Sequence, residues 1–184
     1  ICNIRNINFV KNESSGKDLS IFCGFTQSVW NPEIIEKQGI GGSEEAVFWL
    51  SRLWAQMGWK VTIFNNCGHR EINHEGVSWK PYWAWNYRDK TDVTVIWRVP
   101  KWCDYDINSS KIFIDLHDVI QEGEFNAKRL KRIDKILVKS QAQRDLFPDV
   151  PENKFEIVPN GIDSQIFKDH VKRDPFLLIN TAAP

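Results

Sequence analysis

The chain has 184 residues, of which 42% are apolar and 26% charged, and its 24 basic side chains are balanced by 24 acidic ones. These proportions are typical of a globular domain with one core, and the balanced charge argues against a nucleic-acid partner. Apolar runs are too short for a transmembrane segment, and the four cysteines form no CxxC pair for a zinc knuckle. Free thiols without a visible signal peptide predict a reducing, cytoplasmic location.

The first half of the chain predicts one strand–helix–strand unit. Residues 1–18 are polar and without periodicity, which indicates a linker or lead-in, and 19–25 is a short apolar run that predicts a buried strand. A long loop over 26–40 follows. Ser43 is expected to cap a helix that reaches Met57, with an apolar face at helical spacing made of Val47, Leu50, Leu53, Trp54 and Met57.

Strands and helices then alternate along the chain. Strands are predicted at 61–64, 77–79, 93–97, 112–116, 136–138 and 155–158, and helices at 125–133 and from Ser140 to Pro148. Short apolar strands that alternate with helices predict an α/β fold, in which a Rossmann-like, doubly wound parallel sheet has helices on both faces.

The end of the sequence predicts a change of domain. The charged segment 168–174 has the composition of an interdomain linker, and the apolar run at 176–179 predicts a further strand. We therefore expect one domain over 19–167, followed over 168–184 by a linker and the first strand of a second, truncated domain.

Ligands of open α/β sheets bind beyond the carboxyl ends of the strands, and four loops of this chain lie there. The first contains Gly41, Gly42 and Ser43 at a helix start, which suits a diphosphate, although a plain tight turn explains the same residues. The second contains Arg98, directly after Trp97, which is either a phosphate or carboxylate ligand or an ordinary surface arginine.

The third loop carries the strongest candidate for catalysis. His117 follows a predicted strand and is flanked by Asp115 and Asp118, an arrangement suited to contacting a reacting centre, whereas a lone histidine is more often structural. Asp115 and His117 are expected on one side of the strand and Leu116 on the other. The fourth loop, Pro159 to Asp163, is either a turn or a hinge beside a cleft.

Nine tryptophans are many for this length. Core filling explains most of them, but the group at Trp79, Trp83 and Trp85 also suits a stacking platform for sugar rings.

Three segments together resemble a known family. GIGGSEEAVFWLSRLWAQMGWKVTIFN, FIDLHD, and KILVKSQAQRDLF followed by KFEIVPNGID are similar, in this order, to the N-terminal domain of family 4 retaining glycosyltransferases, which have the GT-B fold. The resemblance extends from about Leu19 to Pro184, and VPNGID is its most specific part.

The resemblance implies roles for individual residues. Gly41 and Gly42, with Ser43, would approach the diphosphate of the donor, and His117, with Asp118, would lie beside the donor sugar and the acceptor hydroxyl. It also places the remaining candidates, with Glu44, Trp97 and Arg98 in the acceptor cleft and Asn160 and Gly161 at the hinge.

The implied reaction transfers a sugar, with retention, from a UDP- or GDP-sugar to a hydroxyl of a glycan, lipid or protein. It needs neither a metal ion nor a tightly bound cofactor, and it requires a C-terminal donor-binding domain, so the chain alone is expected to be inactive. Alternatives are a nucleotide-sugar epimerase of the same fold, a non-catalytic carbohydrate-binding module, and a metal phosphohydrolase with His117 and Asp118 as ligands.

Overall fold

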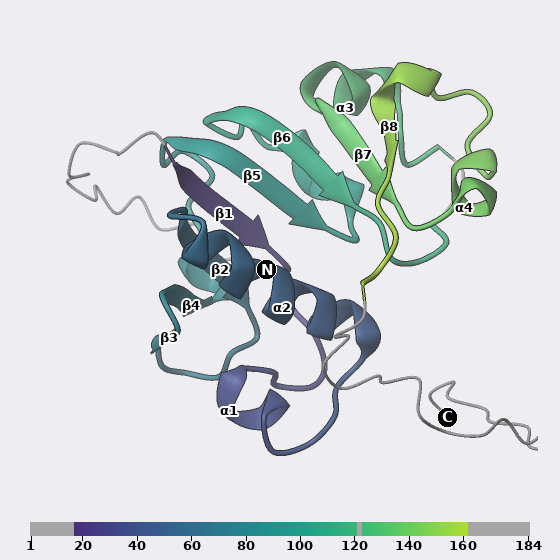
Figure 1. Cartoon of the computed structure of the whole chain (residues 1–184). Coiled ribbons are helices and arrows are strands. Elements are labelled where there is room, and N and C mark those ends of the chain that lie inside the picture. The colour runs from purple at the N-terminus through teal and green to yellow at the C-terminus, as the bar shows by residue number, and fades with distance from the viewer. Residues whose placement is uncertain (1–16, 121–122, 162–184) are drawn as a thin grey trace, which may run out of the picture.

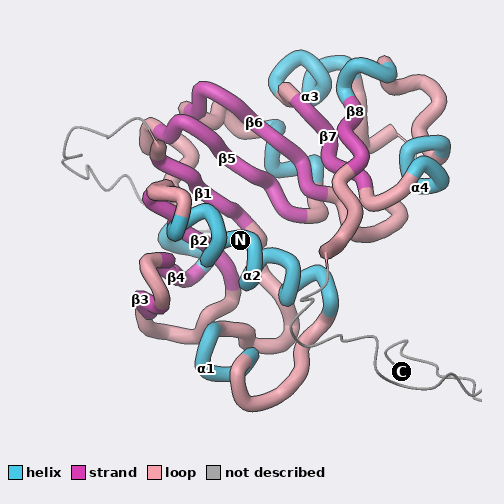
Figure 2. The backbone as a smooth tube through the Cα atoms, viewed as in Figure 1, coloured by secondary structure: helices cyan, strands magenta, loops and turns pink. Residues whose placement is uncertain are grey.

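A computed structural model describes residues 17–120 and 123–161 of the chain. In it, eight strands form one sheet in the spatial order β3-β4-β2-β1-β5-β6-β7-β8 (Figures 1 and 2). The strands are β1 (Asp18–Phe22), β2 (Lys60–Asn65), β3 (Ile72–His74), β4 (Val77–Pro81), β5 (Thr91–Trp97), β6 (Ser109–Asp115), β7 (Lys135–Val138) and β8 (Phe155–Ile157). The seven strands expected between residues 19 and 158 are confirmed, with ends that shift by a few residues.

Every pairing in the sheet is parallel except that of β3 with β4. The sequence did not predict β3, which forms an antiparallel hairpin with β4 through the two-residue turn Glu75-Gly76. Both turn residues have positive φ, 48° and 82°, as a tight hairpin of this kind requires. The turn was not predicted because Glu75 stands at the position before the glycine, where asparagine or aspartate is usual.

Two helices connect β1 with β2. The short helix α1 (Pro32–Ile35) lies within the segment expected to be a loop, and the Asn31 side chain caps it by accepting a hydrogen bond from the backbone of Ile34. The longer helix α2 (Gly42–Gln56) begins two residues earlier than a cap at Ser43 predicts. Its N-cap is Gly41, not Ser43, and no side chain caps this helix start.

The buried face of α2 is also rotated from the predicted one. Val47, Phe48 and Ser51 are buried, whereas Leu53 and Met57 are exposed. A polar residue can occupy the centre of the buried face because the Ser51 hydroxyl donates to the carbonyl oxygen of Phe48, at 2.9 Å. The predicted face is right in part, since Val47 is buried and Trp54 packs against the same core, but periodicity counted only apolar residues and missed Ser51.

The connections beyond β5 use shorter elements. They are the 3-10 turns η2 (Pro100–Asp104) and η3 (Glu152–Lys154) and the helices α3 (Ala127–Arg132) and α4 (Gln141–Asp145), and the turn η1 (Tyr82–Ala84) follows β4. Helix α3 is shorter than the predicted 125–133. Ser140 caps α4 as expected, accepting from the backbone of Gln143 at 3.2 Å.

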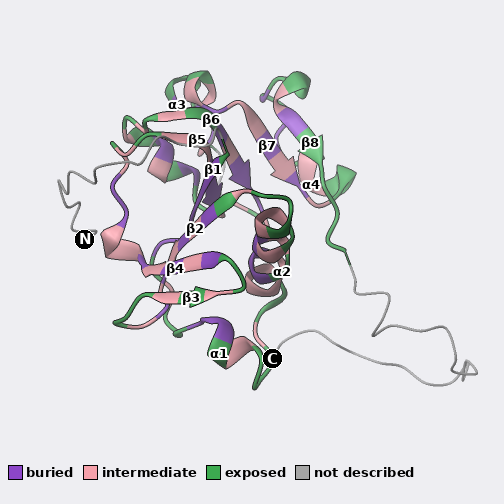
Figure 3. Cartoon of the chain, turned by 60° about the vertical axis from the view of Figure 1, so that its left-hand side comes forward, coloured by how far each residue is buried: buried purple, intermediate pink, exposed green. Residues whose placement is uncertain are grey.

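Both faces of the sheet carry a hydrophobic core. Neighbouring residues of one strand alternate between two clusters, so that Trp97 belongs to one cluster and Ile96 to the other. Helix α2 packs Val47 and Phe48 into the first cluster, and Leu130 of α3 packs against the second. Strand β1, which contributes residues to both clusters, is buried along its whole length (Figure 3). The chain is thus an α/β protein with a mostly parallel sheet, which is compatible with a Rossmann-like fold.

Some expectations fall partly or wholly outside the described residues. The predicted strand at 176–179 and the boundary between 167 and 168 lie there, as does most of the expected lead-in, although β1 already begins at Asp18. Among the helices of the described ranges, none has the length and apolar character needed to cross a membrane.

Candidate functional site

A cavity of about 630 Å³ opens at the edge of the sheet where β1 and β5 end. Its lining consists of residues 26–30, which follow β1, residues 38–41 before α2, and the side chains of Ile34, Glu44 and Arg98. Gly41 and Glu44, from the first predicted loop, and Arg98, from the second, therefore line the same cavity. The carboxyl edge of a parallel sheet is the position at which ligand sites are expected.

Asparagine side chains hold the wall of this cavity. Asn65, which is fully buried, donates from Nδ2 to the carbonyl oxygen of Trp30 at 2.7 Å, and Asn66 donates to that of Thr26 at 2.9 Å. Asn31 adds a bond from its Nδ2 to the carbonyl oxygen of Cys67, at 3.1 Å. Sequence reasoning missed these residues, and two consecutive asparagines at the end of a predicted strand were the available signal.

The start of α2 forms another part of the cavity. Its first N–H groups have no acceptor within the helix, and Ser43 does not cap them, since its hydroxyl donates to Oε2 of Glu44 at 2.7 Å. The carboxylate of Glu44 lies against Gly41, where a Cβ atom would come within 2.5 Å of Oε2. A Cβ atom on Gly42 would meet nothing within 4 Å. A Cβ atom at Gly41 would therefore displace only the flexible end of the Glu44 side chain, and Gly42 faces open space.

Arg98 joins three segments at the carboxyl edge. Its backbone has a φ of 66°, a conformation that costs a non-glycine residue free energy, and its N–H donates to the carbonyl oxygen of Asp115 at 2.9 Å. The guanidinium lies over the ring of Trp97, 4.7 Å from its centroid. Its Nε is paired with Asp118, and one terminal nitrogen lies 3.8 Å from Glu44. Two carboxylates therefore oppose its positive charge.

A buried group of charged side chains lies at the ends of β6 and β7. Nε2 of His117 donates to Oδ2 of Asp115 at 3.0 Å, and Nζ of Lys139 donates to the other carboxylate oxygen at 2.5 Å. Burial by itself raises the pKa of Asp115, but the hydrogen bonds and charges of His117 and Lys139 outweigh it and hold that pKa below its usual value. Asp115 is therefore ionised and accepts both bonds.

This group confirms one expectation about the third loop and corrects another. Asp115 and His117 do lie on the same side, while Leu116 is fully buried in the opposite cluster. The ring of His117, however, is not open to the cavity, since only 4% of its side chain is exposed. The buried carboxylate of Asp115 needs hydrogen-bond donors, and it holds the histidine ring inward.

Of the other residues predicted for the cleft or for catalysis, Trp97 is buried and Asp118 is accessible. Trp97 is a core residue rather than a cleft residue, because it is buried and packs against Trp30. Asp118 is half exposed and pairs with Arg98, while Gln143 of α4 donates to its carbonyl oxygen at 3.1 Å. His117 and Asp118 therefore bind different partners instead of forming a pair. Within 17–120 and 123–161, no three His, Cys, Asp or Glu side chains gather closely enough to hold a metal ion.

The tryptophan group of 79–85 is mostly structural. Trp79 and Trp85 are buried in the two clusters, as core filling predicts, and only Trp83 is partly exposed. Asn160 and Gly161, the expected hinge, are exposed beyond the end of β8. The segment that would follow such a hinge lies outside the described residues.

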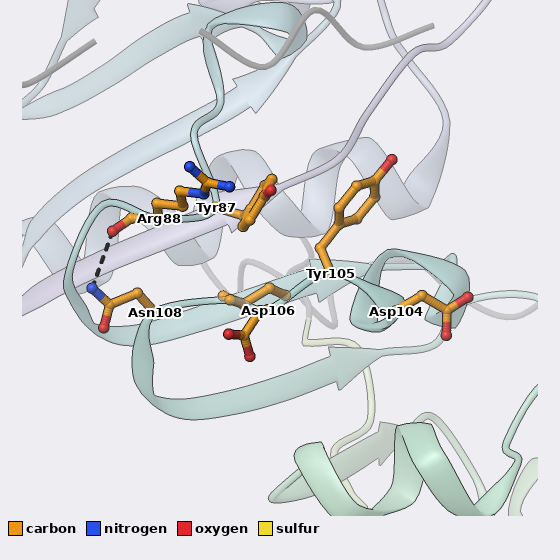
Figure 4. Close-up of a pocket in the computed structure, with 7 residues that line it drawn as sticks. Tyr87, Arg88, Asp104, Tyr105, Asp106 and Asn108 are labelled. Carbon is orange, nitrogen blue, oxygen red and sulfur yellow. Dashed lines mark hydrogen bonds between the residues drawn. The ribbon is translucent and has the colours of Figure 1, made fainter. Parts of the chain in front are cut away.

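A second cavity, of about 660 Å³, lies at the opposite edge, where residues 104–108 and Tyr87–Arg88 precede β6 and β5. The rings of Tyr87 and Tyr105 pack against each other 5.1 Å apart, and the guanidinium of Arg88 lies over Tyr87. In Figure 4, Asp106 points away from these rings. Because its aromatic faces are covered and it lies at the amino ends of the strands, this cavity is not the candidate site.

No protein-family model and no curated protein matches this sequence. The assignment of function therefore depends on the geometry of the carboxyl edge and on the sequence motifs.

Proposed function

We propose that this chain is the acceptor-side domain of a glycosyltransferase that uses a nucleotide-sugar donor. The observation that carries the proposal is the position of the 630 Å³ cavity. Along the sheet, β2 and β4 lie on one side of β1, and β5 to β8 follow on the other. The order of the strands thus reverses between β1 and β5, and ligands of doubly wound sheets bind at such a reversal. We take the sheet to be doubly wound, as in the N-terminal half of a GT-B fold.

The donor diphosphate would bind at the start of α2. The first-turn N–H groups at Gly42 and Ser43 lack helical acceptors, and the helix dipole favours an anion at this end. The open space at Gly42 leaves the backbone accessible. At present the Glu44 carboxylate occupies the adjoining position, so a diphosphate has to displace it and compete with it for Arg98.

In the same proposal the reacting sugar lies beside Asp118 and His117. Asp118 is reachable at the edge of the sheet, whereas His117 is covered, so substrate binding must move neighbouring side chains before the ring is contacted. No resident metal or cofactor is part of the proposal. A UDP- or GDP-sugar is the donor class. We place the reaction in a reducing, cytoplasmic compartment because Cys23, Cys67 and Cys103 are free thiols.

The proposal is tested by measuring transfer of labelled sugar from UDP- and GDP-sugars in a protein that joins this chain to its donor-binding domain, including Asn160 and Gly161 as the connection. Gly42→Val places a side chain between the helix start and the diphosphate without a clash in the free domain. We expect a loss of transfer of about a hundredfold, as for other preorganised backbone donors, with an unchanged melting temperature.

Glu44→Gln is the matched second variant, since it keeps the size of the side chain and removes the charge beside Arg98. If Glu44 competes with the diphosphate, this variant binds the free nucleoside diphosphate more tightly than the natural sequence. Normal transfer by a stably folded Gly42→Val protein would show that the loop is only a turn. Binding of sugar without any binding of nucleotide would instead identify a carbohydrate-binding module.

A further inference from the structure

The buried carboxylate of Asp115 binds a different side chain at each of its two oxygens. Oδ2 accepts from Nε2 of His117 at 3.0 Å, and Oδ1 accepts from Nζ of Lys139 at 2.5 Å. Less than a fifth of each of the three side chains is exposed. They come from neighbouring strands, because Asp115 ends β6 and Lys139 follows β7, which pairs with β6. One carboxylate therefore separates a buried lysine from the histidine.

The charge of Lys139 balances that of Asp115. Although burial raises the pKa of Asp115, its two partners hold that pKa below the usual value, so the carboxylate is ionised. One carboxylate and one ammonium group have no net charge. A charged His117 ring would add a positive charge without a counter-charge to a buried site, which is costly. The pairing therefore favours an uncharged ring.

The other ionisable groups of the neighbouring strands do not change this balance. Arg98, after β5, gives its backbone N–H to the carbonyl oxygen of Asp115, but its guanidinium is paired with Asp118. Cys23, after β1, has its thiol pKa raised well above the usual value, by burial first and then by the charge of Asp115, so it is uncharged. The two acidic residues that flank the histidine are thus each paired with a basic side chain, Asp115 with Lys139 and Asp118 with Arg98.

The second ring nitrogen of His117, Nδ1, is left as a hydrogen-bond acceptor. In an uncharged imidazole one nitrogen carries the proton and the other accepts a bond, and here the proton is on Nε2, which donates to Asp115. Among the described residues, Nδ1 has no hydrogen-bond partner. A charged ring would carry an N–H without an acceptor at this position, which adds to its cost. Nδ1 is therefore suited to a ligand group that donates, such as a hydroxyl.

We propose that Lys139 is a positioning residue for His117, an inference that rests on the proposed function. By balancing Asp115, it keeps the ring uncharged with its proton on Nε2, so that Nδ1 accepts a hydrogen bond from a hydroxyl of the bound sugar. In this state the ring is not an acid, because its single proton is held by Asp115. Gln143 fixes the geometry, since it accepts from the N–H of Lys139 at 2.7 Å and donates to the carbonyl oxygen of Asp118 at 3.1 Å.

Nitrogen NMR of the 184-residue chain with isotope-labelled histidine rings tests this inference without any sugar. A His117→Gln variant identifies the signals of this ring, because they disappear. At neutral pH we expect a protonated Nε2 and an unprotonated Nδ1 in the natural sequence. A charged ring, or a proton on Nδ1, would overturn the inference, and this measurement does not depend on the folding of a Lys139 variant.

Lys139→Met removes the ammonium group and keeps the length of the side chain. The ring then becomes the remaining counter-charge for Asp115, so we expect it to bind its proton at least about tenfold more tightly. Lys139→Arg keeps the charge and should restore the uncharged ring. Lys111→Met is the matched control, because Lys111 forms a similar pair with Asp134, at 2.8 Å, at the other edge of the sheet. It should leave the His117 ring unchanged. Equal proton binding in Lys139→Met and the natural sequence would reject the role of Lys139.

Sugar transfer by the two-domain protein separates this inference from the proposed function. Because Nδ1 accepts only while the ring is uncharged, the acid limb of the kcat profile should move up by about one pH unit or more in Lys139→Met and return in Lys139→Arg. An unchanged profile, despite the altered ring, would show that the reaction does not use Nδ1 and would overturn the inference. The expected NMR result without transfer by any of these proteins would reject the proposed function and leave Lys139 as the residue that sets the state of the ring.

Discussion

The two edges of the sheet carry cavities of similar volume, about 630 Å³ at the carboxyl edge and 660 Å³ at the amino edge, but they are built differently. At the carboxyl edge the supporting polar groups are buried, as for Asp115, His117 and Asn65. The cavity at the amino edge includes an exposed acidic side chain, that of Asp106, which is 92% accessible. Buried polar groups depend on one another for hydrogen bonds. The carboxyl edge is therefore held in one arrangement, as a binding site requires.

The largest difference between the edges should come from their aspartates. Asp115→Asn leaves the ammonium group of Lys139 buried without its counter-charge, and breaking a buried pair in this way costs about 3–5 kcal/mol of folding free energy. Asp106→Asn removes only an exposed contact with Arg132, so it should change stability by less than about 0.5 kcal/mol. Urea unfolding measures both, and equal effects would remove the distinction between the edges.

Acid should weaken the carboxyl edge through the same residue. The pKa of Asp115 is lower in the folded than in the unfolded chain, so its contribution to stability is complete above the unfolded value of about 3.9 and is lost as the pH falls through the folded value. At the amino edge, hydrogen bonds from Arg129 likewise lower the pKa of Asp104, so acid acts there as well. We expect stability to decline below about pH 4 and Asp115→Asn to flatten that decline. If the free energy of unfolding changes with pH between 2 and 7 in the same way for both proteins, the prediction is wrong.

Two asparagines give a more conservative comparison, because each donates from Nδ2 to a backbone carbonyl. Asn65 does so in the buried wall of the carboxyl cavity at 2.7 Å, and Asn108 in the exposed amino cavity, to Arg88, at 3.0 Å. Asn65→Ala should cost about 1–3 kcal/mol, because it leaves a buried carbonyl oxygen unpaired. Asn108→Ala should cost less, since water replaces its bond. Thermal unfolding with calorimetry distinguishes the two, and an equal or larger loss for Asn108→Ala would refute the difference.

The smallest expected effect concerns the backbone of Arg98. Because its φ is 66°, Arg98→Gly relieves the strain that Arg98→Ala retains, although both lose the contacts with Asp118 and Glu44. The glycine variant should therefore be the more stable of the two by about 1 kcal/mol. Chemical denaturation provides the measurement. If the Arg98→Ala variant is as stable as the Arg98→Gly variant, residue 98 does not adopt the left-handed conformation in solution.

The sequence by itself determined the order of the strands along the chain and the edge at which the candidate residues meet. Short apolar runs such as 93–97 and 112–116 are long enough only for strands, and Ser140 and Pro148 bounded α4 by local chemistry. Because parallel strands end at one edge, Gly41, Glu44 and Arg98 were expected together before the fold was known, and they line one cavity.

Tertiary structure alone decided which of these residues are accessible. The ring of His117 faces inward because Asp115, once buried between β5 and β7, needs donors that lie 2 and 24 residues away along the chain. Likewise, Ser51 rather than Leu53 faces the core, because the rotation of α2 follows the packing of Phe48 on the sheet. Periodicity and spacing record only local preference, whereas burial depends on partners distant in sequence, and the position of a side chain at an active site depends on those partners.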